Sequence, residues 1–320
     1  NGETINYGFG IVYNGQEGQE LNINGGNINY GIINADNACF NQLDSAEGMF
    51  KDMTNLETFE LSSENGDVPF ENTTSMSEMF SGCTSLKDIY ISGWKSLTKL
   101  TDVSKMFYNC SSLESFDGLD EFADCMNSVE NLSYMLYNCK SLSGTDIENS
   151  LKKFYIESAS NLEGMFEKCS NLTSIDMNSW HLTSRVTNIS RMFYGCTSLT
   201  SIDMEECSGE KSMQITNASH LFDGCSKLQT IILPGTTSNS MTDVSYMFRG
   251  VGNGNTKRTI LTNLDKINGY KVTDASYMFQ NAKVEEVELA DYTAWQCGDH
   301  LYLTDEGMSD EAITALVDKY

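Results

Sequence analysis

A short motif recurs along this chain at nearly constant spacing, and this repetition limits the possible folds more than any other feature. The centre of the motif is a Met-Phe pair or a close variant, and successive copies are 26 to 31 residues apart. The nine copies are Met49-Phe50, Met79-Phe80, Met106-Phe107, Met135-Leu136, Met165-Phe166, Met192-Phe193, Leu221-Phe222, Met247-Phe248 and Met278-Phe279. A period of this length is typical of a solenoid, in which each repeat forms one coil stacked on the last.

Each repeat predicts a short helix followed by a short strand. In the third repeat, Val103, Met106, Phe107 and Cys110 stand at i, i+3, i+4 and i+7, which places them on one helical face, and Thr101 to Ser104 have the residue types of a helix N-cap. Downstream, apolar residues alternate with outward residues, as expected of a strand. These strands are predicted at Leu86 to Ile91, Leu113 to Phe116, Leu172 to Met177, Leu199 to Met204, Leu228 to Leu233 and Leu261 to Leu264.

Six of the ten cysteines occupy one position of the repeat, three residues after the Phe or its Leu136 variant. They are Cys83, Cys110, Cys139, Cys169, Cys196 and Cys225. The other three repeats have Met53, Val251 and Ala282 there, and a cysteine that bound a metal or formed a disulfide could not be exchanged for these residues. We therefore predict a small buried apolar position.

Four cysteines lie outside this position: Cys39, Cys125, Cys207 and Cys297. Cys297 and His300 have a C-x-x-H spacing that a transition metal could use. One such pair without a second is weak evidence, so we predict no metal site and no resident cofactor.

The repeats resemble those of a known family in their residue sequence. Residues 188–204, NISRMFYGCTSLTSIDM, and residues 102–117, DVSKMFYNCSSLESFD, resemble the BspA-type leucine-rich repeats of bacterial surface proteins, and the similarity covers roughly residues 41–290. The fourth repeat and residues 251–260 depart from the pattern. The resemblance implies an α/β, right-handed leucine-rich-repeat solenoid with one short parallel strand and one short helix per coil, about nine coils, and end caps. It also implies exported proteins that adhere or act as structural parts, with no catalytic residues.

The two ends of the chain predict caps for this solenoid. Residues 1–40 are rich in Gly, Asn and β-forming residues, which indicates an N-terminal β-rich cap before a solenoid of residues 41–290. Residues 291–320 are expected to form a C-terminal cap. Within it, Ser309 followed by acidic and then apolar residues predicts a helix.

Composition excludes several classes of function. The chain has 45 acidic and 20 basic residues and a net charge of -25, so its field repels nucleic acids and anionic lipids. No run of eighteen apolar residues predicts a membrane span. The three histidines, His181, His220 and His300, fall in separate parts of the chain, and no common catalytic motif is present. We therefore predict that the protein is not an enzyme.

One outward strand position forms an acidic column. Successive repeats contribute Glu60, Tyr90, Asp117, Asp146, Asp176, Asp203, Ile232, Asp265 and Glu288. Side chains stacked at about 4.8 Å in a parallel sheet repel one another if all are charged, unless they are hydrated, partly protonated or bridged by a cation. The column is therefore either a solvated face that prevents strand pairing with other chains or a stripe that binds a ligand or cation, including calcium.

Two functions remain after these exclusions. The first is a non-enzymatic extracellular surface protein that adheres to, or binds, a host or cell-surface protein or glycan through the solenoid face. The alternative is a structural subunit that binds other copies of itself in a filament, sheath or virion component.

Overall fold

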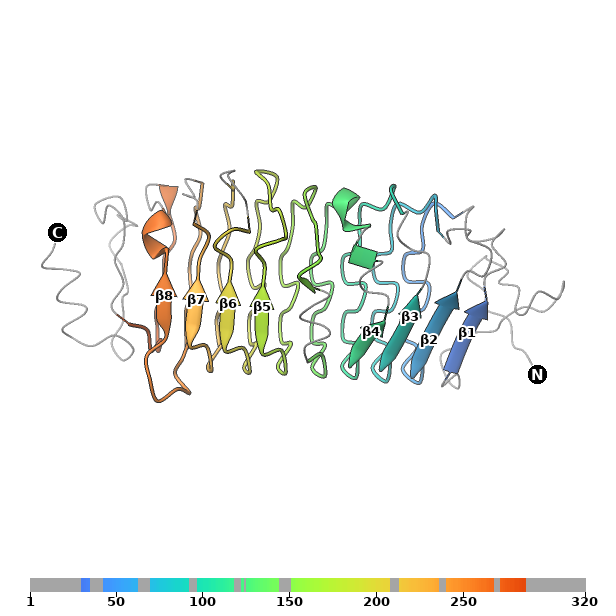
Figure 1. Cartoon of the computed structure of the whole chain (residues 1–320), viewed down its shortest axis with the longest axis horizontal. Coiled ribbons are helices and arrows are strands. Elements are labelled where there is room, and N and C mark those ends of the chain that lie inside the picture. Colours follow the sequence, from blue (N-terminus) through green and yellow to red (C-terminus); the bar gives the residue numbers. More distant parts are fainter. Residues whose placement is uncertain are drawn as a thin grey trace, which may run out of the picture.

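The coils of the chain form one elongated stack in the computed structural model, with their strands side by side along its length (Figure 1). The structure describes residues 30–34, 43–62, 70–91, 97–117, 122–123, 125–143, 151–207, 213–235, 240–267 and 271–285.

The strands form two parallel four-stranded sheets, each in sequence order. The first sheet contains β1 (Tyr30–Asn34), β2 (Thr58–Ser62), β3 (Asp88–Ile91) and β4 (Ser115–Asp117). The second contains β5 (Ser174–Asp176), β6 (Ser201–Asp203), β7 (Thr230–Ile232) and β8 (Ile260–Thr262). The six strands predicted from the alternating pattern are confirmed as β3 to β8. The alternating burial of β5 to β7 places one Ile of each strand in the core.

The predicted helix of each repeat is wrong: all nine Met-Phe segments are runs of turns. Two residues of every segment have positive φ, the one before the Met and the second one after the Phe, as at Lys105 (54°) and Asn109 (62°). A left-handed residue at both places cannot continue a right-handed helix. Helical residues lie outside these segments, and they include the 3₁₀ turns η3 (Met126–Ser128) and η4 (Leu264–Lys266).

Backbone hydrogen bonds explain why turns replace the helix. Alternate N–H groups close turns within the coil, as Met106 N does to Val103 O at 3.2 Å. The N–H groups between them donate to the next coil, as Phe107 N does to Met135 O at 2.9 Å. In a helix, the N–H groups would donate within their own coil. In this arrangement, alternate N–H groups bond each coil to its neighbour, and Val, Met, Phe and Cys still face inward.

The residues predicted as N-caps do cap, but they cap turns. Asp102 Oδ1 accepts the N–H of Ser104 at 2.8 Å, and Asn188 Oδ1 accepts that of Ser190 at 3.0 Å. The same position forms a parallel bridge column through Ser45, Ser75, Asp102, Asn131, Asn161, Asn188, Asn217, Asp243 and Asp274. Asp and Asn suit this place because their short side chains bond the backbone two residues on.

The core is a set of side-chain stacks along the axis. Phe166 and Phe193 stack at 5.6 Å between ring centroids, and Phe193 and Phe222 at 5.7 Å. Phe59 of β2 contacts Phe80 of a turn segment at 4.8 Å, so strands and turns share one core.

The repeated cysteines are confirmed as core residues. All six are buried and free, and each thiol donates to the backbone carbonyl of the Phe, or of Leu136, in the preceding coil at 3.0 to 3.2 Å. Burial raises the pKa of the Cys83 and Cys169 thiols to about 12, so these cysteines stay protonated and unreactive at neutral pH. Cys125 and Cys207 are buried as well.

The described part of the N-terminal region continues the sheet. β1 pairs in parallel with β2, so residues 30–34 form its first described strand. Cys39, Cys297, His300 and the predicted C-terminal helix at residues 309–317 lie outside the described residues.

Candidate interaction face

The structure brings part of the predicted acidic column together. Strand register places Glu60, Tyr90 and Asp117 side by side in the first sheet. In the second sheet, Asp176 pairs with Asp203.

The rest of the predicted column is interrupted or lies outside the described residues. Ile232 pairs with Asp203 on one side and with Thr262 on the other, so Thr262 takes the place expected of Asp265. Asp265 lies in η4 instead, because the strand of that coil ends earlier than predicted. Asp146 and Glu288 lie outside the described residues.

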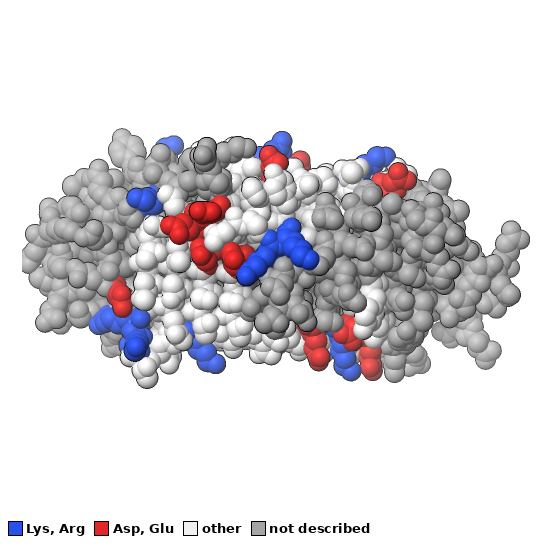
Figure 2. All heavy atoms as spheres, viewed as in Figure 1, with Lys and Arg blue, Asp and Glu red and all other residues white. Residues whose placement is uncertain are grey.

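The best-defined acids of this column have a local structural use. Asp176 Oδ1 accepts the N–H of Asn178 at 3.1 Å, and Asp203 Oδ1 accepts that of Glu205 at 3.0 Å. Lys152 Nζ also lies 3.6 Å from Asp176. The hydrogen bonds of Asp176 and Asp203 therefore stabilise the turns that end their strands. Figure 2 shows acidic side chains gathered beyond the carboxyl ends of β5 to β7, with basic side chains beside them.

A second surface, which sequence reasoning missed, is built by the Met-Phe turns. We define the turn face by two positions of each repeat, the residue before the Met and the residue after the Phe. From repeat one to nine they are Gly48 and Lys51, Glu78 and Ser81, Lys105 and Tyr108, Tyr134 and Tyr137, Gly164 and Glu167, Arg191 and Tyr194, His220 and Asp223, Tyr246 and Arg249, and Tyr277 and Gln280. Parallel stacking of the turns brings equivalent side chains of neighbouring coils together.

Aromatic rings stack along the turn face. Tyr108 and Tyr137 lie 4.3 Å apart with nearly parallel planes. His220 stacks on Tyr246 at 4.5 Å, and Tyr246 on Tyr277 at 5.0 Å. These five rings are half-buried, so each exposes an edge while its neighbours fix its orientation.

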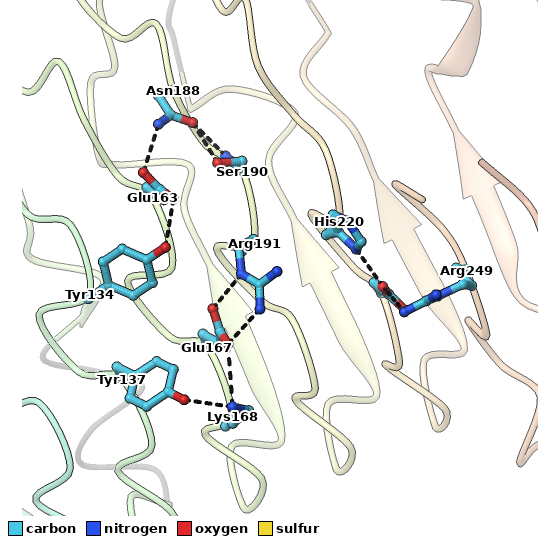
Figure 3. Close-up of polar contacts among 11 residues, drawn as sticks. Tyr134, Tyr137, Glu163, Glu167, Lys168, Asn188, Ser190, Arg191, His220 and Arg249 are labelled. Atoms are coloured by element: carbon cyan, nitrogen blue, oxygen red, sulfur yellow. Dashed lines mark hydrogen bonds and ion pairs between the residues drawn. The ribbon is translucent and has the colours of Figure 1, made fainter. Parts of the chain in front are cut away.

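Glu167 is the centre of the first ionic cluster on this face (Figure 3). Its side chain is only 2% exposed, and Arg191 of the next coil binds it through Nε and Nη2 at 2.8 and 2.9 Å. Lys168 Nζ lies 3.6 Å from Glu167 and donates to Tyr137 Oη at 2.6 Å. The hydrogen bond from Arg191 to Glu167 raises the pKa of Arg191, so the guanidinium stays charged. Arg191 also lies over the Tyr194 ring at 4.5 Å.

Asp223 is the centre of a second ionic cluster (Figure 3). Its side chain is 4% exposed and receives Arg249 of the next coil, with Nη2 at 2.7 Å. His220 Nδ1 lies 2.7 Å from the same carboxylate oxygen. Arg249 lies over the Tyr246 ring at 4.7 Å, which joins this ionic cluster to the aromatic stack.

A third cluster connects Tyr134, Glu163 and Asn188 (Figure 3). Tyr134 Oη donates to Glu163 Oε1 at 2.6 Å, and Asn188 Nδ2 donates to Glu163 Oε2 at 3.1 Å. Burial, together with the hydrogen bond to Glu163, raises the pKa of Tyr134.

The turn face is nearly neutral in a strongly acidic chain. Its basic residues Lys51, Lys105, Arg191 and Arg249 offset Glu78, Glu167 and Asp223. The chain as a whole has 45 acidic and 20 basic residues, so the excess acid lies elsewhere.

One cavity among the described residues has a volume of about 20 Å³. Its lining is mainly apolar and includes Ile189, Met204 and Leu221. It is just large enough for one water and has few polar partners to hold it. No group of three His, Cys, Asp or Glu residues in the described ranges is placed to hold a metal ion.

A sequence signal for the turn face did exist. The second residue after the Phe is Gly, Asn or Asp in eight of nine repeats, Lys168 being the exception. These residue types tolerate positive φ and disfavour a helix interior. The residue types at that position predict turns. Two side chains of each such turn then face outward and stack in columns along the solenoid.

Comparisons with known proteins give matches to two family models and to solved structures. A model of the family described as "Mycoplasma protein of unknown function, DUF285" matches residues 40–146 and 117–213. A model of the type III restriction-modification EcoP15I C-terminal domain matches residues 255–320, most of which lie outside the described residues. No curated protein matches the chain.

Among solved structures, the chain is similar to a leucine-rich cell surface protein of Faecalibacterium prausnitzii A2-165. The two are 15% identical, and the match covers 77% of this chain and 83% of that one with a TM-score of 0.27. No helix in the described part of the chain has the length and apolar character that crossing a bilayer requires.

The DUF285 match begins at residue 40, where the predicted solenoid begins, and spans more than half of the chain. It covers the first six Met-Phe repeats, whose turns and strands follow one another in register. The resemblance to BspA-type repeats is confirmed for this region, and the chain belongs to the DUF285 family.

Proposed function

We propose that this chain is a non-enzymatic surface protein that binds a protein partner through its turn face. The observation that supports this most directly is the half-buried array of Tyr, His and Arg side chains, held by stacking and by buried carboxylates. Its location at a cell surface is supported by the resemblance of its repeats to those of bacterial surface proteins.

The residue types of the turn face favour a protein partner. Tyr and Arg are enriched in the residues that contribute most to binding at protein interfaces. Because Arg191 and Arg249 are fixed by Glu167 and Asp223, they lose little side-chain freedom when a partner binds.

The arrangement of the rings on the turn face favours a macromolecule over a small ligand. Small-molecule sites are concave and bury most of their ligand. Rings stacked on one another present edges, which suits contacts spread over several coils better than stacking on a sugar ring.

The nearly neutral charge of the turn face also favours a protein partner. A chain of net charge -25 repels other acidic proteins, most of all at low salt. On the turn face the basic and acidic residues nearly balance, so this repulsion is weaker there, and aromatic rings are available for contact.

The test compares two double variants of the same chain on arrays of host matrix proteins and of glycans. Tyr246→Ser with Tyr277→Ser removes aromatic contact from the turn face, and Tyr90→Ser with Tyr155→Ser removes the same number of rings elsewhere. We expect the first variant to lose binding to the protein array at least tenfold and the second to retain it.

Two outcomes would overturn the proposal. Binding that survives the turn-face variant but is lost with Asp176→Asn and Asp203→Asn would assign the interaction to the acidic column. Light scattering that shows filaments or closed rings of the purified chain would favour the structural subunit, with other copies as its partner.

A further inference from the structure

The eighth repeat contains an insertion that the core does not use. Between Cys225 and Thr230, the start of β7, the seventh repeat has four residues, while between Val251 and Ile260, the start of β8, the eighth has eight. The segment entering β8 extends past its neighbours in the stack (Figure 1), and Figure 2 shows basic side chains at the foot of β8. We call residues 252–258, Gly-Asn-Gly-Asn-Thr-Lys-Arg, the basic loop.

The coils on both sides hold the basic loop in one conformation. Lys283 Nζ donates to the carbonyls of Asn255 and Thr256, and Asn255 Nδ2 donates to Leu228 O. Gly252 has φ of 65°, and a Cβ there would lie 2.1 Å from Thr259 Oγ1. The loop therefore requires glycine at this position, and its shape is set before any ligand arrives.

The loop has hydrogen-bond donors without a partner among the described residues. Thr256, Lys257 and Arg258 are exposed, and their backbone N–H groups have no acceptor among the described residues. The Lys257 ammonium likewise has no described partner, whereas Arg258 gives Nη1 to Val284 O at 2.9 Å and keeps its other nitrogens free. Free N–H groups next to two cations can donate hydrogen bonds to a tetrahedral oxyanion.

The charge of the rest of the chain limits what that anion is attached to. With a net charge of -25, the molecule repels any long polyanion outside the loop's own range, which is about 8 Å at physiological salt. Isolated charged groups on a neutral polymer avoid that repulsion. Asn253 and Thr256 are exposed beside the cations and can bond neutral hydroxyl groups.

We propose that the basic loop binds a single phosphate or sulfate ester carried on an otherwise neutral surface glycan. This site is separate from the turn face and does not depend on the protein partner proposed for it. Glu285 is the exposed acidic residue nearest in sequence to the loop's support at Lys283 and Val284, and it weakens the local positive field.

The experiment measures binding of the full chain to immobilised dextran bearing sparse sulfate or sparse phosphate esters, with uncharged dextran as the blank. The loop variant is Lys257→Gln with Arg258→Gln. Its matched control is Lys99→Gln with Lys140→Gln, which changes the net charge equally at exposed lysines of distant coils. We expect the loop variant to bind at least tenfold more weakly, the control to bind within twofold of wild type, and Glu285→Gln to bind severalfold more tightly.

The two ester arms show which anion the loop prefers, and binding of either supports the proposal. The proposal is overturned if wild type binds neither ester, or if the control variant loses as much affinity as the loop variant. It is also overturned if heparin or phosphatidylglycerol vesicles bind more tightly than the sparse esters, since that would indicate a dense polyanion or a membrane as the ligand.

Discussion

Glu167 and Asp223 occupy the same position of the repeat in two coils separated by one other, and they satisfy a buried carboxylate in different ways. Both are almost fully buried, and both bind an arginine of the following coil. Arg191 comes from the position before the Met, 24 residues after Glu167, whereas Arg249 comes from the position after the Phe, 26 residues after Asp223.

The sequence of the following coil explains this difference. Repeat six has Arg191 before its Met and Tyr194 after its Phe, whereas repeat eight has Tyr246 before its Met and Arg249 after its Phe. The third partner differs as well, a lysine at 3.6 Å for Glu167 and a histidine at 2.7 Å for Asp223. The two arginine pairs therefore form through the repeat register, whereas the lysine and the histidine are near neighbours in sequence.

The strongest test of the comparison removes Arg191. Arg191→Met keeps the length of the side chain but leaves Glu167 buried with only a distant lysine. Breaking a buried ion pair costs about 3 to 5 kcal/mol, and because Arg191 is about one-third exposed we expect the lower end, about 3 kcal/mol. Urea denaturation measures the loss in free energy of unfolding. The double variant Glu167→Leu with Arg191→Met should recover most of it, and no recovery would show that Arg191 acts mainly by packing.

The corresponding change in the other cluster has a smaller expected effect. Arg249→Met leaves Asp223 with its hydrogen bond to His220 at 2.7 Å, so we expect a loss of about 1 to 2 kcal/mol. Adding His220→Phe, which retains a ring for stacking on Tyr246, should raise the loss toward that of Arg191→Met. Equal losses for Arg249→Met and Arg191→Met would mean that His220 does not compensate. The same urea denaturation measures both variants.

The third cluster predicts an alkaline change in stability. The raised pKa of Tyr134 means that the folded state holds this proton more tightly than the unfolded chain does. The stabilisation is therefore fully present below the ordinary tyrosine value, about pH 10, and is lost as the pH rises above it. Tyr134→Phe should lose less stability than wild type between pH 9 and 11. Tyrosinate absorbance should show Tyr134 ionising after the other tyrosines, and ionisation together with them would contradict the assignment.

The core and sheet could be predicted from the sequence because apolar spacing reports burial directly. Cys110 and Phe107 are buried whether their segment is a helix or a run of turns, since both place i, i+3, i+4 and i+7 inward. The same ambiguity hid the turns, and with them the turn face. The ion pair of Arg191 with Glu167 could not be predicted, because it depends on which of two outward columns each side chain reaches.

The smallest predicted effect tests the left-handed residues that the helix prediction missed. Gly164 and Lys105 stand at the same position of their repeats with φ of 58° and 54°. A side chain in this region costs about 1 kcal/mol or more, and glycine's greater freedom in the unfolded chain offsets part of that. Lys105 contributes a single exposed ion pair to Glu78 at 3.7 Å, which is worth little. Lys105→Gly should therefore stabilise the protein by about 0.5 kcal/mol.

Gly164→Ala supplies the reverse change for comparison. A Cβ at Gly164 would lie 2.3 Å from the Tyr134 ring, so this variant should lose stability through displacement of Tyr134 from Glu163 as well as through φ. Thermal unfolding of both variants separates the two causes. If strain at this position is general, Lys105→Gly raises the Tm slightly, and Gly164→Ala in a Tyr134→Ser background still lowers it. If Lys105→Gly lowers the Tm, the turns impose no strain on a non-glycine residue, and the loss from Gly164→Ala comes from the tyrosine contact alone.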